Sequence, residues 1–263
     1  MIPDPVIEIE HLSYQYPDGT PALKDIRLAV NRHESVAILG PNGAGKSTFL
    51  YHLNGTLMGD GHVRVLGLTV EKKNLREIRR RVGVVFQNPD DQLFCPTVFD
   101  DVAFGPLNMG LDPREVRHRV ERALEIMGLR GFEARSAHHL SEGEKKRVAL
   151  ATVLSMDSEI LALDEPTDNL DPVASRRLIE RIQAIPQTKM IVTHHLPVVA
   201  DLCARAVLLR GGELVGDLPT EEFLKRPDLL EGFGFDPEFA RWLLGRMKRA
   251  GGAGSGATHP HEG

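Results

Sequence analysis

The fold of this chain is decided by the stretch Gly40-Pro41-Asn42-Gly43-Ala44-Gly45-Lys46-Ser47-Thr48, which fits the phosphate-binding pattern G-x-x-x-x-G-K-[ST]. The glycines let backbone N–H groups turn toward phosphates, Lys46 supplies a positive charge, and the Ser47 hydroxyl can ligate Mg²⁺. The apolar run 35–39 predicts a buried strand, and 46–53 a helix whose N-terminus faces the phosphates. A glycine turn without a ligand is the alternative, and the flanking strand and helix favour nucleotide binding.

Composition bounds the class of protein. With 263 residues, 41% of them apolar, the chain can form one large domain, or one domain with a small appendage. A net charge of −5 argues against a general nucleic-acid binder. Only Cys95 and Cys203 are present, far apart in sequence, which suggests a reducing compartment. The N-terminus resembles no signal peptide, so a cytosolic chain is expected.

Before the phosphate loop, residues 6–16 and 23–30 alternate apolar and polar residues around the turn 17–19. This pattern predicts an antiparallel hairpin with one buried face. Tyr16 stands at its tip, where a tyrosine serves either packing or stacking on a base.

After the loop, residues 63–66 and 82–86 predict strands and 74–81 a short helix. The polar, proline-broken stretch 87–94 predicts a surface loop, and 97–138 a helical insert whose second helix begins with a capping box at Asp112-Pro113-Arg114-Glu115.

In the second half of the chain, a predicted buried strand is again followed by polar residues. Ile160 to Leu163 predicts a strand that ends in Asp164-Glu165, at the edge where parallel sheets bind ligands. Two acids in a loop are usually only solvated, but this position favours a role toward a metal and a water. Residues 190–193 end in the same way at His194.

Beyond Thr220 the sequence predicts two helical pieces. Residues 226–250 form the expected C-terminal helical extension, and the Gly/Ala/Ser-rich tail 251–263 is expected to be disordered.

Taken together, the order of motifs up to about residue 225 resembles the nucleotide-binding subunits of ABC transporters. The matching motifs are the adenine-stacking Tyr16, the Walker A loop Gly40 to Ser47, the Mg²⁺-sensing Gln87, the signature Leu140 to Glu144, Walker B at Ile160 to Asp164, the catalytic Glu165, the D-loop Asn169 to Asp171, and the switch histidine His194.

This resemblance implies an α/β fold: a P-loop (RecA-like) ABC ATPase core over 1–225, with an N-terminal antiparallel β subdomain and an α-helical subdomain inserted at about 88–158. It implies catalytic roles for Glu165, His194 and Gln87, and Mg²⁺ binding by Ser47, Gln87 and Asp164. The implied ATP contacts are Tyr16, Gly40, Pro41, Asn42, Gly43, Ala44, Gly45, Lys46, Ser47, Thr48, Ser141, Gly143 and Asp171.

Within the family the chain is similar to the ATPases of energy-coupling-factor importers, particularly those of cobalt and nickel uptake. The residues that carry this are 87–94, 100–111 and 144–149. The implied assembly is a homodimer, or a heterodimer with a paralogous ATPase, held by integral membrane coupling and substrate-binding subunits at the cytoplasmic face of the membrane. Asp90, Asp91 and Gln92 are expected to contact those subunits. A vitamin importer, a soluble ABC ATPase and a regulatory subunit remain alternatives.

Three residues depart from the family's pattern. Glu142 replaces the first signature glycine, His33 replaces a glycine before the phosphate-loop strand, and His195 stands where an acid is common. Only Glu142 falls on the chemistry expected of the site.

Overall fold

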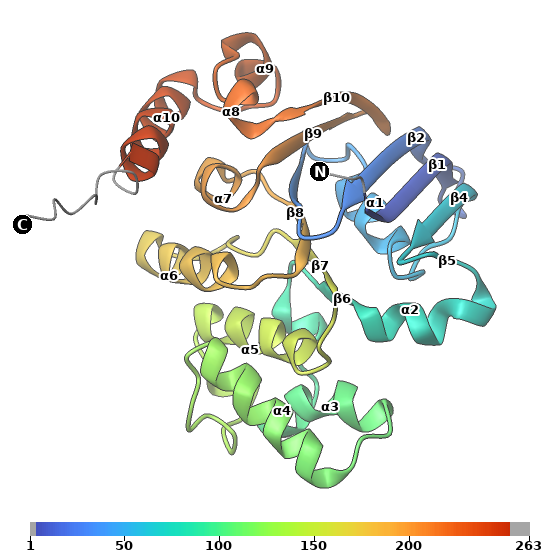
Figure 1. The fold of residues 1–263 in the computed structure, drawn as a ribbon, viewed down its shortest axis with the longest axis vertical. Helices are drawn as coiled ribbons and strands as arrows, with labels where there is room; N and C mark the ends of the chain where they lie inside the picture. The colour runs from blue at the N-terminus through green and yellow to red at the C-terminus, as the bar shows by residue number, and fades with distance from the viewer. Residues whose placement is uncertain (1–3, 253–263) are drawn as a thin grey trace, which may run out of the picture.

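The computed structural model describes residues 4–252, and the strands in that range form two sheets that lie beside each other (Figure 1). The larger sheet is parallel except at one edge, where β10 pairs antiparallel with β9. Its strands in spatial order are β10 (Glu213–Pro219), β9 (Arg205–Arg210), β3 (Ser35–Leu39), β8 (Thr188–Val192), β7 (Ile160–Asp164) and β6 (Val82–Val85).

The smaller sheet is antiparallel and comes from the N-terminal part of the chain, at the right of Figure 1. The predicted hairpin is confirmed, because its two long strands pair antiparallel with Ile9 opposite Leu28. Its strands in spatial order are β2 (Pro21–Asn31), β1 (Pro5–Gln15), β4 (Asp60–Val65) and β5 (Leu68–Thr69).

Successive residues of the larger sheet face two different cores, as the pleat of a strand requires. On β3, Val36 and Ile38 belong to the core shared with the smaller sheet, α1 (Lys46–His52) and α2 (Leu75–Arg81). Ala37 and Leu39 belong to the core formed with α5 (Glu142–Leu154), α6 (Pro172–Gln183) and α7 (Leu196–Leu202). The phosphate-loop strand is therefore buried on both faces.

Two loop glycines are fixed by close backbone approaches. A Cβ on Gly40 would lie 2.3 Å from the carbonyl oxygen of Leu209, and one on Gly45 would lie 2.4 Å from that of Ala22. Gly45 also has a φ of 96°, in the left-handed region that side chains disfavour, where it caps the N-terminus of α1. The loop can approach β9 and β2 only because these positions lack side chains.

The predicted helical insert follows β6 and lies at the bottom of Figure 1. It consists of η2 (Pro89–Asp91), α3 (Val98–Asn108) and α4 (Pro113–Ile126), which pack against α5. Asp112 caps α4 as predicted, by accepting from the N–H groups of Arg114 and Glu115. Glu115 pairs with Arg119 at 2.6 Å.

The C-terminal part differs from the prediction in two respects. Within residues 4–252, three helices follow β10 instead of two: α8 (Thr220–Phe223), α9 (Pro227–Gly232) and α10 (Pro237–Gly252). Helix α10 continues through the first two positions of the tail expected to be disordered, and the rest of that tail lies outside the described residues. No helix within residues 4–252 is long and apolar enough to cross a membrane.

Candidate nucleotide site

Four neighbouring strands of the larger sheet end at one edge and deliver the predicted site residues there. Strand β3 leads into the phosphate loop with Lys46, β8 into His194, β7 into Glu165 and β6 into Gln87. The side chains of these residues and the loop line one hollow of about 380 Å³. The sheet order β3-β8-β7-β6 therefore brings together residues that are far apart in sequence.

Within the loop, Lys46 is almost buried and donates to the carbonyl oxygens of Gly40 at 2.8 Å and Pro41 at 3.0 Å. Burial lowers its pKa, although the charges of Glu165 and Asp164 oppose that shift. The hydroxyls of Tyr16 and Thr48 are 2.7 Å apart, which fixes the tip of the β1–β2 hairpin beside the loop. Tyr16 remains 37% exposed, so its ring is accessible to a ligand.

Asp164 is 1% exposed, and its two carboxylate oxygens have different surroundings. The Tyr51 hydroxyl donates to Oδ2 at 2.9 Å, whereas Oδ1 is buried and has no hydrogen-bond partner within residues 4–252. Burial raises the pKa of Asp164, and the nearby hydroxyl groups of Ser47 and Tyr51 oppose the rise. The Asp164 carboxylate lies near Ser47, and Ser47 and Gln87 line the same hollow. Carboxylate, hydroxyl and amide oxygens are ligands that suit Mg²⁺.

Glu165 has a φ of 44°, an uncommon backbone conformation for a residue with a side chain. Its backbone N–H donates to the carbonyl oxygen of Val192, so the turn is anchored to β8. Its carboxylate accepts from the backbone N–H of His194 at 3.1 Å and lies 3.0 Å from the imidazole Nδ1. The Glu165 side chain is 10% exposed and that of His194 is 64% exposed, which places the carboxylate deep and the imidazole at the rim.

A residue that the sequence analysis missed joins the Gln87 and Glu165 turns. The ammonium group of Lys146, on α5, donates to the carbonyl oxygen of Gln87 at 2.9 Å and to that of Glu165 at 3.1 Å. Lys146 is 4% exposed, and burial lowers its pKa. Its helical spacing from the buried Ala149 and Leu150 was the signal that it lies on the inner face of α5.

The Gln87 side chain itself donates to Asp168 at 2.9 Å. Gln87 is exposed and lies in the same hollow as the phosphate loop. The hydrogen bond to Asp168 uses the amide nitrogen, so the amide oxygen of Gln87 is not engaged by it.

The remaining predicted ATP contacts do not reach the phosphate loop of this chain. Ser141, Gly143 and Asp171 line a second hollow of about 630 Å³, together with Glu142 and Arg177. Ser141 and Glu144 form a capping box at the start of α5, in which each side chain accepts from the other residue's backbone N–H, and Asp171 caps α6. A single chain therefore presents two separate parts of the expected site.

The predicted partner-coupling residues fall into two groups. Asp90 and Asp91 are exposed, and Asp90 pairs with Lys145 at 2.7 Å. The amide of Gln92 is hydrogen-bonded inside the chain. It accepts from the N–H of Phe86 at 3.2 Å and donates to Ala149 and Thr152 on α5.

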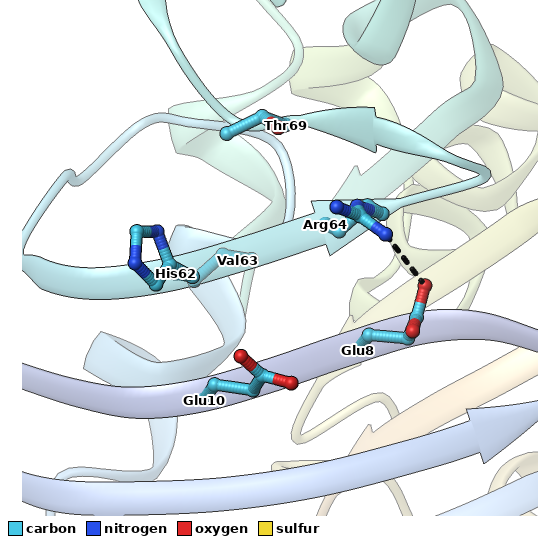
Figure 2. A pocket seen from close by; sticks show the side chains of 6 residues that line it. All are labelled: Glu8, Glu10, His62, Val63, Arg64 and Thr69. Atoms are coloured by element: carbon cyan, nitrogen blue, oxygen red, sulfur yellow. Dashed lines mark ion pairs between the residues drawn. The ribbon is translucent and has the colours of Figure 1, made fainter.

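Another hollow, on the outer face of the smaller sheet, has different chemistry. Figure 2 shows Glu8 and Glu10 on β1 facing His62 and Arg64 on β4, with Glu8 and Arg64 paired at 3.9 Å. These are cross-strand charges on a solvent-facing sheet, and none of the predicted site residues lies among them.

Comparison with known proteins decides the family. The profile of the ABC transporter family matches residues 23–168, more than half of the chain. The chain belongs to the ABC ATPase family. This ABC ATPase is 46% identical over 252 residues to the energy-coupling factor transporter ATP-binding protein EcfA of Methanothermobacter thermautotrophicus. The aligned stretch covers 94% of this chain and 81% of that protein. The chain is 43% identical to EcfA1 of Methanospirillum hungatei, covering 94% and 91%.

Solved structures agree with this assignment. One solved structure is that of CbiO1 of Clostridium perfringens, part of the ABC transporter complex CbiONQ. It is 34% identical to the present chain, with a TM-score of 0.77 over 91% of this chain and 99% of CbiO1. A dimeric ATP-binding cassette bound to ADP and phosphate is 25% identical, with a TM-score of 0.74 over 81% and 98%. The protein is thus the ATP-hydrolysing subunit of an energy-coupling-factor type ABC transporter.

We predict that Glu165→Gln lowers the steady-state rate of ATP hydrolysis to less than about a tenth of the wild-type rate. Loss of a general base costs about 10²-fold or more, whereas a carboxylate near a polyphosphate contributes no attraction for ATP. ATP affinity, measured by equilibrium binding, should therefore not fall. Glu180→Gln, on the exposed side of α6, is the control. A Glu165→Gln variant that keeps more than a tenth of the rate would contradict the role.

Proposed function

We propose that this ABC ATPase powers the uptake of a transition metal ion, cobalt or nickel, by binding and hydrolysing ATP at the interface of a dimer. The metal assignment is supported by the resemblance of residues 87–94 and 100–111 to the ATPases of cobalt and nickel importers. The likeness to CbiO1 extends over 91% of the chain, which supports the same subgroup. Two relatives named only as energy-coupling factor proteins keep a vitamin importer as the second candidate.

The proposed mechanism assigns each part of the phosphate hollow a task. Glu165 orients or deprotonates the attacking water, Lys46 and the loop amides bind the phosphates, and His194 contacts the γ-phosphate from the rim. Ser47, Asp164 and Gln87 would hold Mg²⁺, which neutralises phosphate charge when bound. The depth of Glu165, beneath the exposed His194, supports this division because the carboxylate is largely shielded from bulk solvent.

The dimer follows from the separation of the two hollows. The signature residues Ser141 and Gly143 cannot serve the nucleotide held by Lys46 of the same chain, because they line a different hollow. A second ABC ATPase chain, rotated by a two-fold axis, would place each signature hollow against the other chain's phosphate loop. We propose two ATP molecules enclosed in this way, by two copies of this chain or by this chain and a paralogue.

The helical insert offers a surface for the membrane subunits. Phe94 and Phe104 are 62% and 49% exposed, with ring centroids 5.1 Å apart, and Leu107 is also exposed. Asp90 and Asp91 lie on η2, in the loop that joins β6 to this surface. An apolar patch beside acidic residues suits a partner helix that presents apolar and basic side chains. We propose that the protein binds its membrane partner here, at the cytoplasmic face of the membrane.

The substrate assignment is tested by transport. The chain is purified with its integral membrane partners, these are placed in vesicles, and accumulation of cobalt, nickel and vitamins is measured with ATP on the outer side. We expect ATP-dependent accumulation of cobalt or nickel, which Glu165→Gln abolishes. Accumulation of a vitamin without either metal would contradict the metal assignment and leave the ATPase role intact.

We predict that replacing Asp90 and Asp91 together by Asn weakens assembly with the membrane subunits. The isolated chain should bind nucleotide as before, because neither acid lines the phosphate hollow. The Asp90 side of the ion pair lost with Lys145 is 54% exposed, and ion pairs at a protein surface are worth about 1 kcal/mol or less. Assembly is measured by pull-down of the membrane partner, with Asp228→Asn as a surface control. An unchanged pull-down would place the partner's binding surface elsewhere.

Glu142 is the one signature residue at which helix stability and ATP binding conflict. A carboxylate in the first turn of α5 stabilises that helix end by about 0.3 to 1 kcal/mol. In a closed dimer the same helix end would face the partner's γ-phosphate. There, a phosphate charge about 4 Å from the Glu142 carboxylate would repel it, at a cost of about 1 kcal/mol in bulk water and about 4 kcal/mol at an effective dielectric of 20. The repulsion is the larger effect, so Glu142 should weaken closure.

We therefore predict that Glu142→Gly tightens the ATP-dependent dimer and lowers the ATP concentration for half-maximal hydrolysis. It should also destabilise the free α5 by up to about 1 kcal/mol through backbone entropy. Dimerisation is measured against ATP concentration for both proteins at low and high salt. Equal curves, or a weaker dimer in the glycine variant, would mean that Glu142 points away from the nucleotide and only caps the helix.

A further inference from the structure

The surroundings of Asp164 differ at its two oxygens, and the difference is made by Tyr51. The phenol donates to Oδ2 at 2.9 Å, and Oδ1 is left buried and unpartnered among the described residues. We infer that Tyr51 is a specificity-determining residue of the cation site: its hydrogen bond to one oxygen of Asp164 disfavours a cation that binds both oxygens at once. This inference rests on the proposed Mg²⁺ site at Ser47 and Asp164.

The position of Tyr51 is set by the phosphate-loop helix itself. Tyr51 follows Ser47 by four residues on α1, which puts both side chains on one face of the helix, and both interact with Asp164. The hydroxyl that is expected to ligate the metal and the hydroxyl that restrains the carboxylate therefore move as one rigid unit. A change in the position of α1 shifts both together.

The ring of Tyr51 is also restrained. It packs edge to face against Phe86, the residue between β6 and Gln87, with ring centroids 5.6 Å apart. A phenol is protonated at neutral pH, so its hydroxyl can donate to Oδ2. Packing of the ring against Phe86 fixes where that hydroxyl lies.

The chemistry of the two common divalent cations gives this arrangement a consequence. Mg²⁺ demands near-ideal octahedral geometry and takes single oxygens from carboxylates, whereas Ca²⁺ accepts six to eight ligands and readily takes both oxygens of one carboxylate. The hydrogen bond from the phenol takes up a lone pair of Oδ2 and holds the carboxylate in one orientation, which disfavours a cation that binds both oxygens at once. Tyr51 therefore favours the smaller ion, and its removal should relax the preference without removing a ligand.

The test compares wild-type protein with Tyr51→Phe, which deletes one hydroxyl and keeps the ring against Phe86. Mn²⁺ is bound to each full-length protein with a non-hydrolysable ATP analogue and followed by electron paramagnetic resonance, and Mg²⁺ or Ca²⁺ is then added until half of the Mn²⁺ is displaced. For each protein, the Ca²⁺ concentration at half-displacement is divided by the Mg²⁺ concentration at half-displacement. We expect this ratio to be lower in Tyr51→Phe than in the wild type by about threefold or more. Tyr51→Leu should shift it in the same direction.

Two controls separate this inference from simpler outcomes. Tyr14→Phe removes a phenol from the neighbouring hairpin and should leave the ratio unchanged. Asp164→Asn should lose protein-bound Mn²⁺; if it does not, or if the wild type binds none, the proposed Mg²⁺ site is wrong. Mn²⁺ bound at Asp164 would support the Mg²⁺ site. If the ratio of the Ca²⁺ to the Mg²⁺ concentration that displaces it is then the same in Tyr51→Phe as in the wild type, the role of Tyr51 in selectivity is overturned while the Mg²⁺ site stands.

Discussion

The shared edge of four parallel strands is the constraint on which the site depends. Strands β3, β8, β7 and β6 are buried and hydrogen-bonded to each other in that order, so the residues that follow them must emerge side by side. Four residues that line the hollow are close together because the strands share this edge, and no set of direct bonds joins all of them: Lys46, His194, Glu165 and Gln87. A shift in the register of one strand would move its polar residue out of the hollow.

The buried ammonium of Lys146 adds a second level of organisation. It connects the helix that begins at the signature motif to the backbone of Gln87 and to that of Glu165. In the proposed dimer, α5 begins where the other chain's nucleotide is bound, and Gln87 begins the loop toward the membrane partner. Under that proposal, Lys146 links the helix end at the nucleotide to the loop toward the membrane partner and to the backbone of Glu165. A rigid-body movement of α5 is then expected to move both turns.

The sequence predicted what is local in the chain and missed what depends on distant partners. The phosphate loop and Asp164-Glu165 directly follow apolar strands, so pattern alone placed them at the sheet edge. Tyr51 was missed because its partner Asp164 lies 113 positions away. Lys146 was missed because its partners Gln87 and Glu165 lie 59 and 19 positions away. The β9–β10 hairpin had a local signal that was not used: Gly211 and Gly212 both have positive φ, in the tight turn between two apolar strands.

The central claim is that one chain carries two separated parts of a composite site. The most direct test is ATP hydrolysis per chain as a function of chain concentration, with sedimentation in ATP over the same range. The account predicts that hydrolysis per chain rises with concentration and reaches half of its maximum where half of the chains are dimeric. A rate per chain that stays constant where the protein sediments as a monomer would contradict it.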